Sequence, residues 1–515
     1  MVFPSRGCIT CKTRRIKCDS VHPLCSRCQK AGRDCVWDQN EEAGLLFKDE
    51  NAFAQGKPRR PWKSKAQEVS GPEAEVVDSA VFPVSSSIPA EDKALQFWLN
   101  NYVFRDDEVP EFAREYNHYS IACRDIAQHD SSLRLIISAL SHAVFGRVMQ
   151  LDESIEEAEK LFARSIDTVQ RETLRLSQSN IDELLLTTML MADYKDVTDK
   201  CYARPNQDEV SLLNLDVTGS QIWKNTCHYD RATDLMRQRQ QNKWTPNLFL
   251  DRAVRRRLIR VCILRGISVP EWLRDGVKFG EQGPVLILDS IMVRVAALRE
   301  RSLCLFLPKS ARFSTQPHPG DLAAEARSLD AALESWSAAL PEDWKFTTRS
   351  GSTPDPTFDV PIHVYATYGH AAIWCRYYAT RLIVNSIRNR ALSVMAQCSS
   401  QMLSVASEQD TCLGNMASLG TDLCRSIPIF FTSVTTEGNP TAARGTATND
   451  DIICVNQEII PKLATLLAWP LILAINTDNI PEFQKQWLEN KLKSVANALG
   501  DAILETVTEQ NELKF

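Results

Sequence analysis

The stretch CITCKTRRIKCDSVHPLCSRCQKAGRDC, residues 8–35, decides how the N-terminus of this chain folds. It holds six of the 16 cysteines in the spacing C-x2-C-x6-C-x6-C-x2-C-x6-C, and the second half of that spacing repeats the first. Each C-x2-C pair can place two thiolates on one side of a tight turn, which suits a tetrahedral zinc site. The predicted metal ligands are Cys8, Cys11, Cys18, Cys25, Cys28 and Cys35.

Six ligands raise a question of stoichiometry. One tetrahedral zinc ion uses four sulfurs and leaves two idle, whereas two ions need eight ligand positions, which six sulfurs fill only if two of them bridge both metals. The repeated spacing favours two Zn2+ ions, because each half then supplies one bridging sulfur. About 30 residues bury too little apolar surface to fold alone, so zinc is expected to supply most of the folding free energy.

The rest of the composition predicts a soluble intracellular chain with reduced thiols. The opening MVFPSRGCITCK has no apolar signal-peptide core, so metal binding is favoured over disulfides. The longest apolar run, LATLLAWPLILAI at 463–475, is too short to span a bilayer and contains Pro470, so it is predicted to be buried core. The ten cysteines from Cys123 to Cys454 lack tight spacing and are predicted to be small buried hydrophobes.

Residues 8–35 resemble the fungal zinc binuclear cluster (Zn2Cys6) DNA-binding domain without a gap. The resemblance implies a small zinc-stabilised domain, residues 1–37, with two short helices around a binuclear cluster. It also implies that Cys8 and Cys25 bridge the two metals. The remaining ligands would then divide into one pair for each zinc, Cys11 with Cys18 and Cys28 with Cys35.

Four of the six residues between Cys11 and Cys18 are cationic, and their mutual repulsion requires a polyanionic partner to offset it. Arginine and lysine can donate to the O6 and N7 atoms of guanine, and they also neutralise phosphates. The resemblance implies that Arg14 and Arg15 read a CGG-like triplet of double-stranded DNA from a short helix. The predicted phosphate contacts are Lys12 and Lys17, followed in the second half by Arg27, Lys30 and Arg33.

A second basic run, GKPRRPWKSK at residues 56–65, lies in a Pro-rich segment predicted to be a flexible basic linker, residues 38–90. It is read as a nuclear-import signal, as an arm along the DNA backbone, or as ordinary solvated linker. Its cations are Lys57, Arg59, Arg60, Lys63 and Lys65. Residues 1–65 carry 14 Lys and Arg against 7 Asp and Glu, whereas the whole chain has a net charge of −6. Residues 38–100 contain no heptads, so binding to DNA as a monomer or as a dimer stays open.

From residue 91 to 515 the pattern predicts a large all-α domain. Loops are expected near 203–219, 308–321, 346–361 and 435–451, where Gly, Pro, Thr and Asp gather. The segment 184–192 is predicted to be fully buried. Three amphipathic faces are predicted: Leu151, Ile155, Ala158, Phe162, Ile166 and Val169; Trp374, Tyr378 and Leu382; and Leu492, Val495, Leu499 and Ile503.

The large domain resembles the α-helical fungus-specific transcription factor regulatory domain. The residues that carry the resemblance are ENAFAQGKPRRPW at 50–62, LPEDWKF at 340–346 and AWPLILA at 468–474. The resemblance implies a domain that tunes activity and engages metabolites or transcriptional co-regulators. Nothing in the sequence names an effector.

These observations predict a nuclear, sequence-specific, zinc-dependent regulator of RNA polymerase II transcription. Phosphate-binding, zinc-protease and nucleophile-elbow motifs are absent from the sequence, so the chain is not expected to be an enzyme. Whether it activates or represses transcription stays open. Two alternatives remain: a helical metabolite-binding or enzymatic domain that a zinc cluster targets, and a scaffold whose zinc cluster binds protein.

Overall fold

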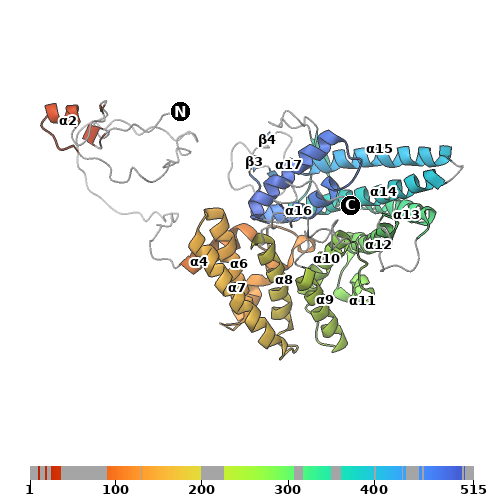
Figure 1. The fold of residues 1–515 in the computed structure, drawn as a ribbon, viewed down its shortest axis with the longest axis horizontal. Coiled ribbons are helices and arrows are strands. Elements are labelled where there is room, and N and C mark those ends of the chain that lie inside the picture. The colour runs from red at the N-terminus through yellow and green to blue at the C-terminus, as the bar shows by residue number, and fades with distance from the viewer. Residues whose placement is uncertain are drawn as a thin grey trace, which may run out of the picture. The chain divides into compact units, whose positions relative to one another are not determined.

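The chain divides into two compact units, Met1–Pro83 and Val84–Phe515, and each is described here by itself (Figure 1). In the first unit the backbone is helical at residues 10–11 and in α2 (Ser26–Lys30). The computed structural model describes residues 8, 10–11, 18–19, 25–35, 90–128, 130–198, 226–306, 317–349, 361–398, 402–431, 433–435, 452–454, 458–501 and 504.

The second unit is built from helices. The α-helices are α4 (Ala90–Tyr102), α5 (Ser120–Ile126), α6 (Ser132–Met149), α7 (Asp152–Thr173), α8 (Ile181–Thr198), α9 (Thr226–Gln241), α10 (Leu248–Arg265), α11 (Glu271–Arg274), α12 (Gly283–Phe306), α13 (Pro319–Ala338), α14 (Tyr368–Cys398), α15 (Met402–Ser426), α16 (Pro461–Ile475) and α17 (Glu482–Leu499). The 3-10 turns are η1 (Glu111–Ala113), η2 (Tyr116–Tyr119), η3 (Gly276–Phe279), η4 (Glu342–Trp344) and η5 (Pro428–Phe431). The all-α prediction is therefore confirmed for the described residues.

Two short antiparallel hairpins accompany the helices. Strand β1 (Thr347–Arg349) pairs with β2 (Ile362–Val364), with Thr347 opposite Val364. Strand β3 (Ser433–Thr435) pairs with β4 (Ile452–Cys454), with Ser433 opposite Cys454. The expected loop at 346–361 is therefore partly strand at its start.

Side chains and glycines at the ends of the helices explain where several of them begin and end. The Asn247 side chain accepts a hydrogen bond from the Leu250 amide and caps α10, and Gly266, with a φ of 63°, ends it. Gly500, with a φ of 63°, ends α17 in the same way. Of the predicted α17 face, Leu492 and Val495 are buried, and Ile503 lies outside the described residues. Helix α13 begins at Pro319, so the last three residues of the expected loop at 308–321 are helical.

The central helices bury most of the predicted core. Helix α14 packs between α13, α15 and α16, and Figure 1 shows α14 and α15 side by side. Its predicted face, Trp374, Tyr378 and Leu382, is buried, and so are all residues of 184–192. The apolar run at 463–475 is buried core as predicted, with Pro470 inside α16.

The buried face of helix α7 is rotated about the helix axis relative to the face that the sequence predicted. Leu151 and Ile166 are exposed, at 44% and 37% of their surface, although both were predicted to face the core. Ser154 and Ser165 are buried instead, because their hydroxyls donate to the backbone carbonyls of His142 at 2.9 Å and Ser132 at 3.1 Å. A satisfied hydroxyl can lie in a core, so a purely apolar pattern misplaces the buried face here.

Helix α6 is long and apolar enough to cross a membrane by length and composition. Of the 18 residues of α6, 67% are buried. The helix packs against α4, α7 and α8. Burial of this kind is typical of a core helix in a folded domain, so we assign α6 to the core of the second unit.

Candidate metal centre and nucleic-acid interface

The second C-x2-C turn leads into α2, and the cysteine itself caps that helix. Cys25 has an extended backbone, and its sulfur accepts a hydrogen bond from the Cys28 amide. The helix ends after Lys30, and Gly32 takes a φ of +56°, in the left-handed region that glycine tolerates. The Arg33 amide then donates to the Cys28 carbonyl at 3.0 Å, which turns the chain back toward Cys35.

The six cysteine sulfurs lie in two overlapping groups, and within each group all sulfurs are within 4.8 Å of one another. Two cysteines, Cys8 and Cys25, belong to both groups. The first group is Cys8, Cys11, Cys18 and Cys25, and the second is Cys8, Cys25, Cys28 and Cys35. The fold therefore brings all six predicted ligands together and makes the same two sulfurs common to both sets of four.

The sulfur–sulfur distances fit tetrahedral zinc. Four sulfurs at about 2.3 Å from a zinc ion are separated by roughly 3.8 Å along each edge of the tetrahedron. The sulfur of Cys8 lies 3.7 Å from those of Cys25 and Cys28 and 3.9 Å from that of Cys18. The sulfur of Cys11 lies 3.7 Å from that of Cys25. Each group could thus hold one zinc ion in a closed site, as structural zinc requires.

Four backbone amides point at the sulfurs, and their pattern repeats between the two halves. The Cys8 amide donates to the Cys18 sulfur at 3.4 Å, and the Cys25 amide donates to the Cys35 sulfur at 3.3 Å. The Cys11 and Cys28 amides donate to the sulfurs of Cys8 and Cys25, both at 3.4 Å. Such outer contacts orient metal ligands and disperse thiolate charge, so the sequence repeat corresponds to a structural repeat.

Burial and the local hydrogen bonds shift the thiol pKa values in opposite directions. Burial, together with neighbouring sulfurs, raises the pKa of Cys11 and raises the pKa of Cys28 to about 12. In Cys8 and Cys25, burial is outweighed by hydrogen bonds from the Cys11 and Cys28 backbone amides, and the pKa falls below its usual value. Zinc, which binds thiolates, must therefore displace the protons that burial holds on Cys11 and Cys28.

Two contacts between the halves of the domain were not anticipated from the sequence. The Thr10 hydroxyl donates to the Asp34 carbonyl at 2.8 Å, which ties the first turn to the end of the second half. The Asp19 carboxylate accepts from the Ser26 amide at 3.1 Å and from the Ser26 hydroxyl, which fixes the start of α2. The only sequence signal for the second contact is an aspartate after Cys18 and a serine after Cys25.

The structure describes three of the predicted DNA-contacting cations. Arg27, Lys30 and Arg33 are exposed, and the first two lie on α2 beside the metal group. Exposed cations on a rigid metal-held turn can neutralise phosphates. The other predicted cations lie outside the described residues: Lys12, Arg14, Arg15, Lys17, Lys57, Arg59, Arg60, Lys63 and Lys65.

Comparison with known proteins identifies the class of the N-terminal unit. Residues 6–43 match the fungal Zn(2)-Cys(6) binuclear cluster domain. The N-terminus is therefore a zinc binuclear cluster domain, which holds two zinc ions, and the remainder of the described chain is predominantly helical. When bound, the zinc ions neutralise the thiolates and cross-link the two halves of the domain.

Curated relatives with this domain have names that describe transcriptional regulators. An uncharacterized transcriptional regulatory protein of Schizosaccharomyces pombe is 58% identical over 33 residues, which are 6% of this chain and 6% of that protein. The sorbicillinoid biosynthetic cluster transcription factor sor3 of Hypocrea jecorina is 32% identical over 96 residues, 18% of this chain and 14% of the relative. The aspercryptin biosynthesis cluster-specific transcription regulator atnN of Emericella nidulans is 62% identical over 29 residues, 6% and 5% of the two chains.

These matches cover a small part of each protein. The chain spans only 5–14% of the length of these three relatives. No solved structure matches the chain. The family match at residues 6–43 is therefore a statement about the N-terminal domain, and it says nothing about the helical unit.

Proposed function

We propose that this chain is a nuclear transcription factor that reads a CGG-like DNA triplet through its zinc cluster and regulates transcription by RNA polymerase II. The observation that carries the proposal is the arrangement of six cysteine sulfurs in two sets of four with two members in common. This arrangement fits the binuclear cluster domain that residues 6–43 match. The names of the curated relatives support a role in transcription.

Within the cluster we assign the bridging role to Cys8 and Cys25, because only these two belong to both groups of four. Cys11 and Cys18 then complete one zinc site. Cys28 and Cys35 complete the other. The lowered pKa of the two bridging sulfurs agrees with this assignment, since a bridging thiolate must hold its negative charge between two cations.

The cations divide into base-reading and phosphate-binding residues. Arg14 and Arg15 carry the planar donor fork that pairs with O6 and N7 of guanine, so we assign base reading to them. Lys12 and Lys17 flank them and are assigned to phosphates. The exposed residues Arg27 and Lys30 of α2, and Arg33 after it, are also assigned to phosphate contacts along the duplex.

The helical unit is proposed to be a regulatory domain and not an enzyme, and we place the domain boundaries at 1–37, 38–90 and 91–515. The all-α fold, the buried Leu340 and Trp344 of LPEDWKF at 340–346, and the largely buried AWPLILA at 468–474 support its likeness to the fungus-specific regulatory domain. Such a domain has the size and the rigid core needed to present a surface to co-regulators.

The test compares binding of the zinc-loaded full chain to short duplexes with one CGG triplet and with the triplet permuted, measured by fluorescence anisotropy. Arg14→Ala and Arg15→Ala are each expected to weaken the binding free energy for the CGG duplex by about 1–3 kcal/mol. Each should also reduce the difference in affinity between the CGG duplex and the permuted duplex. Lys12→Ala is expected to weaken binding to both duplexes equally. It should also reduce the slope of the logarithm of the binding constant against the logarithm of the salt concentration by about 1.

A matched control is Lys160→Ala, which removes an exposed cation of α7 in the helical unit and is expected to leave DNA binding unchanged. A zinc chelator is expected to abolish the preference for CGG. An equal loss on every sequence for all three N-terminal variants would contradict the assigned roles. Binding that survives complete zinc removal would contradict the proposed DNA-binding domain itself.

A further inference from the structure

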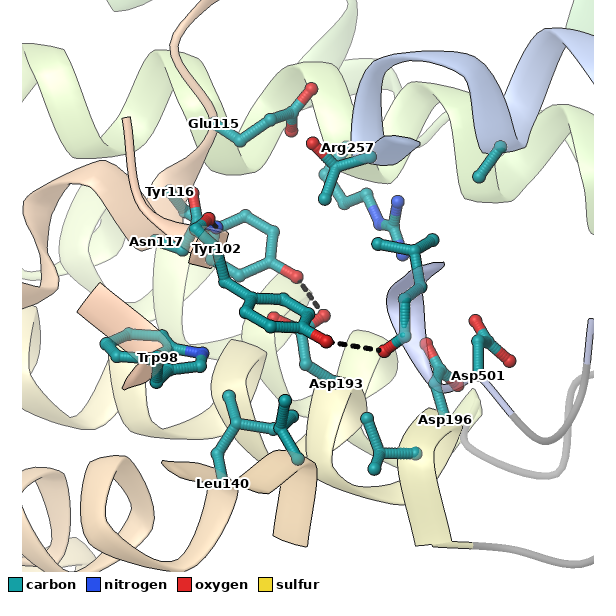
Figure 2. Close-up of a pocket in the computed structure, with 15 residues that line it drawn as sticks. Trp98, Tyr102, Glu115, Tyr116, Asn117, Leu140, Asp193, Asp196, Arg257 and Asp501 are labelled. Atoms are coloured by element: carbon teal, nitrogen blue, oxygen red, sulfur yellow. Dashed lines mark hydrogen bonds between the residues drawn. The ribbon is translucent and has the colours of Figure 1, made fainter. Parts of the chain in front are cut away.

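A pocket lies within the helical unit, where helices that are distant in the sequence converge (Figure 2). Its lining comes from α4, η2, α6, α8, α10, α16, α17 and the turn after α17. The cavity volume is about 120 Å³, and a closed apolar cavity of about 150 Å³ holds one benzene molecule. Because this pocket is partly open to solvent, it can admit one ring with a small substituent.

One wall of the pocket is aromatic and apolar. Trp98 and Tyr102 of α4 and Tyr116 of η2 line it, and each is at least nine-tenths buried. Leu140 and Val144 of α6 add aliphatic surface. Such a wall favours an apolar ring, because burial of apolar surface and contact with aromatic faces both stabilise the complex.

The hydroxyl groups of the lining already donate their protons within the protein. The Tyr102 hydroxyl donates to the backbone carbonyl of Ala498 at 3.1 Å, and the Thr465 hydroxyl donates to a backbone carbonyl of its own helix at 2.7 Å. The Tyr116 hydroxyl donates to the Asp193 carboxylate, as Figure 2 shows. These bonds hold the walls in place before a ligand arrives, which lowers the entropic cost of binding.

The carboxylates of the lining also have partners. Glu115 accepts two hydrogen bonds from Arg260, at 2.6 and 2.8 Å, and Asp193 accepts the tyrosine hydroxyl. Asp196 and Asp501 have interaction partners within the protein as well. The acidic groups therefore do not require a charged ligand, and a neutral ligand brings no new charge into a largely buried site.

The side-chain oxygen of Asn117 is an unsatisfied acceptor in this lining. The Asn117 amide nitrogen donates to the Tyr102 carbonyl at 3.0 Å, and because a carbonyl only accepts, this bond fixes which end of the amide is nitrogen. The Oδ1 atom at the other end is buried and has no hydrogen-bond partner among the described residues. A buried acceptor without a partner is destabilising, so a donor from a ligand would be favoured there.

The Nε atom of Arg257 is an unsatisfied donor in the same lining. Arg257 donates through Nη2 to the Tyr229 hydroxyl at 3.1 Å. Its Nε is buried, and the part of the chain that the structure describes supplies no hydrogen-bond partner for it. A guanidinium has donors only, so this atom can be satisfied only by an acceptor.

We infer that this pocket binds a neutral carboxamide on a single apolar ring. The ring lies against Trp98 and Tyr102, the amide N–H donates to Asn117 Oδ1, and the amide oxygen accepts from Arg257 Nε. A carboxamide carries a donor and an acceptor in one planar group, so it supplies both missing partners. Water can pair with the same two atoms, so the buried ring contributes affinity and the amide contributes specificity.

The test compares three compounds of nearly equal size and shape: benzamide, acetophenone and benzoate. Each is titrated into the full chain, and its dissociation constant is measured by ligand-observed NMR. Benzamide is expected to bind about fivefold or more tightly than acetophenone, whose methyl group leaves Asn117 Oδ1 without a donor. Benzoate is expected to bind more weakly than benzamide for the same reason, since a carboxylate has acceptors only.

Two variants locate the amide. Asn117→Leu removes the acceptor at similar size and is expected to abolish the preference for benzamide over acetophenone. Arg257→Lys keeps the positive charge but places a methylene where arginine has Nε, so it is expected to weaken both carbonyl compounds by the same factor, about fivefold. Thermal melting confirms that each variant is folded. Asn490→Leu, at an exposed position of α17 outside the lining, is the matched control and is expected to change nothing.

Three results would overturn the inference: no binding of benzamide up to its solubility limit, equal binding of benzamide and acetophenone, or a preference for benzamide that persists in Asn117→Leu. If that variant does not fold, the comparison of the compounds on the unmodified chain still decides the question. None of these measurements involves DNA, so their outcome is independent of the function proposed for the zinc cluster.

Discussion

Replacing the shared cysteine Cys25 with serine is expected to damage both zinc sites, whereas replacing Cys28 is expected to damage one. The sulfur of Cys25 belongs to both groups of four, so its loss leaves three sulfurs in each. Loss of Cys28 leaves the group of Cys8, Cys11, Cys18 and Cys25 complete. Bound zinc should fall from two ions to one in Cys28→Ser, and below one in Cys25→Ser.

The size of the effect follows from the number of ligands lost. Structural zinc held by four ligands has an apparent binding free energy of about 10–16 kcal/mol, so one ligand in four corresponds to roughly a 100- to 1,000-fold change in zinc affinity. Cys28→Ser should show this loss for one ion, and Cys25→Ser for both. The Cys28 amide, which donates to the Cys25 sulfur at 3.4 Å, also loses its sulfur acceptor in the second variant.

The assay is zinc content of the full chain after dialysis, followed by competition with a chromophoric chelator. The matched control is Cys227→Ser, which removes an exposed cysteine at the start of α9 and should keep both ions. Equal zinc loss in Cys25→Ser and Cys28→Ser would refute the shared-sulfur arrangement. A wild-type ratio of one zinc per chain would refute it more directly.

Three further predictions concern single contacts. Thr10→Val removes the bond to the Asp34 carbonyl and should cost the zinc domain about 1 kcal/mol, measured as faster zinc loss to a chelator. Burial lowers the pKa of His363 to about 4, so protonation of the unfolded state alone should reduce stability as pH falls from about 6.5 to 4, and His363→Phe should remove this part of the pH dependence of the melting temperature. Asp330→Asn breaks a buried pair with Arg381, at 2.7 and 3.0 Å, and should cost about 3 kcal/mol in chemical denaturation.

The six zinc ligands could be predicted because their spacing lies within one short segment, residues 8–35. Ligand spacing and tetrahedral geometry together limit how six sulfurs can share metals, and the structure brings these sulfurs together in two overlapping groups. The Thr10 and Asp19 contacts could not be predicted in this way. They join residues 24 and 7 positions apart, and neither pair differs in type from ordinary polar surface residues.

The helical unit was predictable as a class and less so in detail. Predominantly apolar segments such as 184–192 and 463–475 identified buried core correctly, because apolar burial dominates their placement. The face of α7 was misjudged, since Ser154 and Ser165 are buried with their hydroxyls satisfied while Ile166 is exposed. The partner that a helix packs against is set by contacts between residues far apart in the sequence. The periodicity of apolar residues within one helix does not reveal those contacts.

The pocket within the helical unit lay beyond sequence reasoning for the same reason (Figure 2). Trp98, Asp193 and Asp501 come from segments about 100 to 400 residues apart, and no motif links them. Each residue alone looks like an ordinary core aromatic or surface carboxylate. Only the fold shows that they line one cavity.

A zinc-held N-terminal domain that reads a specific DNA sequence should select that sequence from a random pool only while it holds zinc. The most direct measurement is selection from random duplexes by the zinc-loaded full chain, repeated after zinc removal, with zinc content determined in parallel. We expect two zinc ions per chain and enrichment of a CGG-like triplet that disappears when the metal is removed. Two zinc ions with no enriched sequence, or enrichment that persists without zinc, would contradict it.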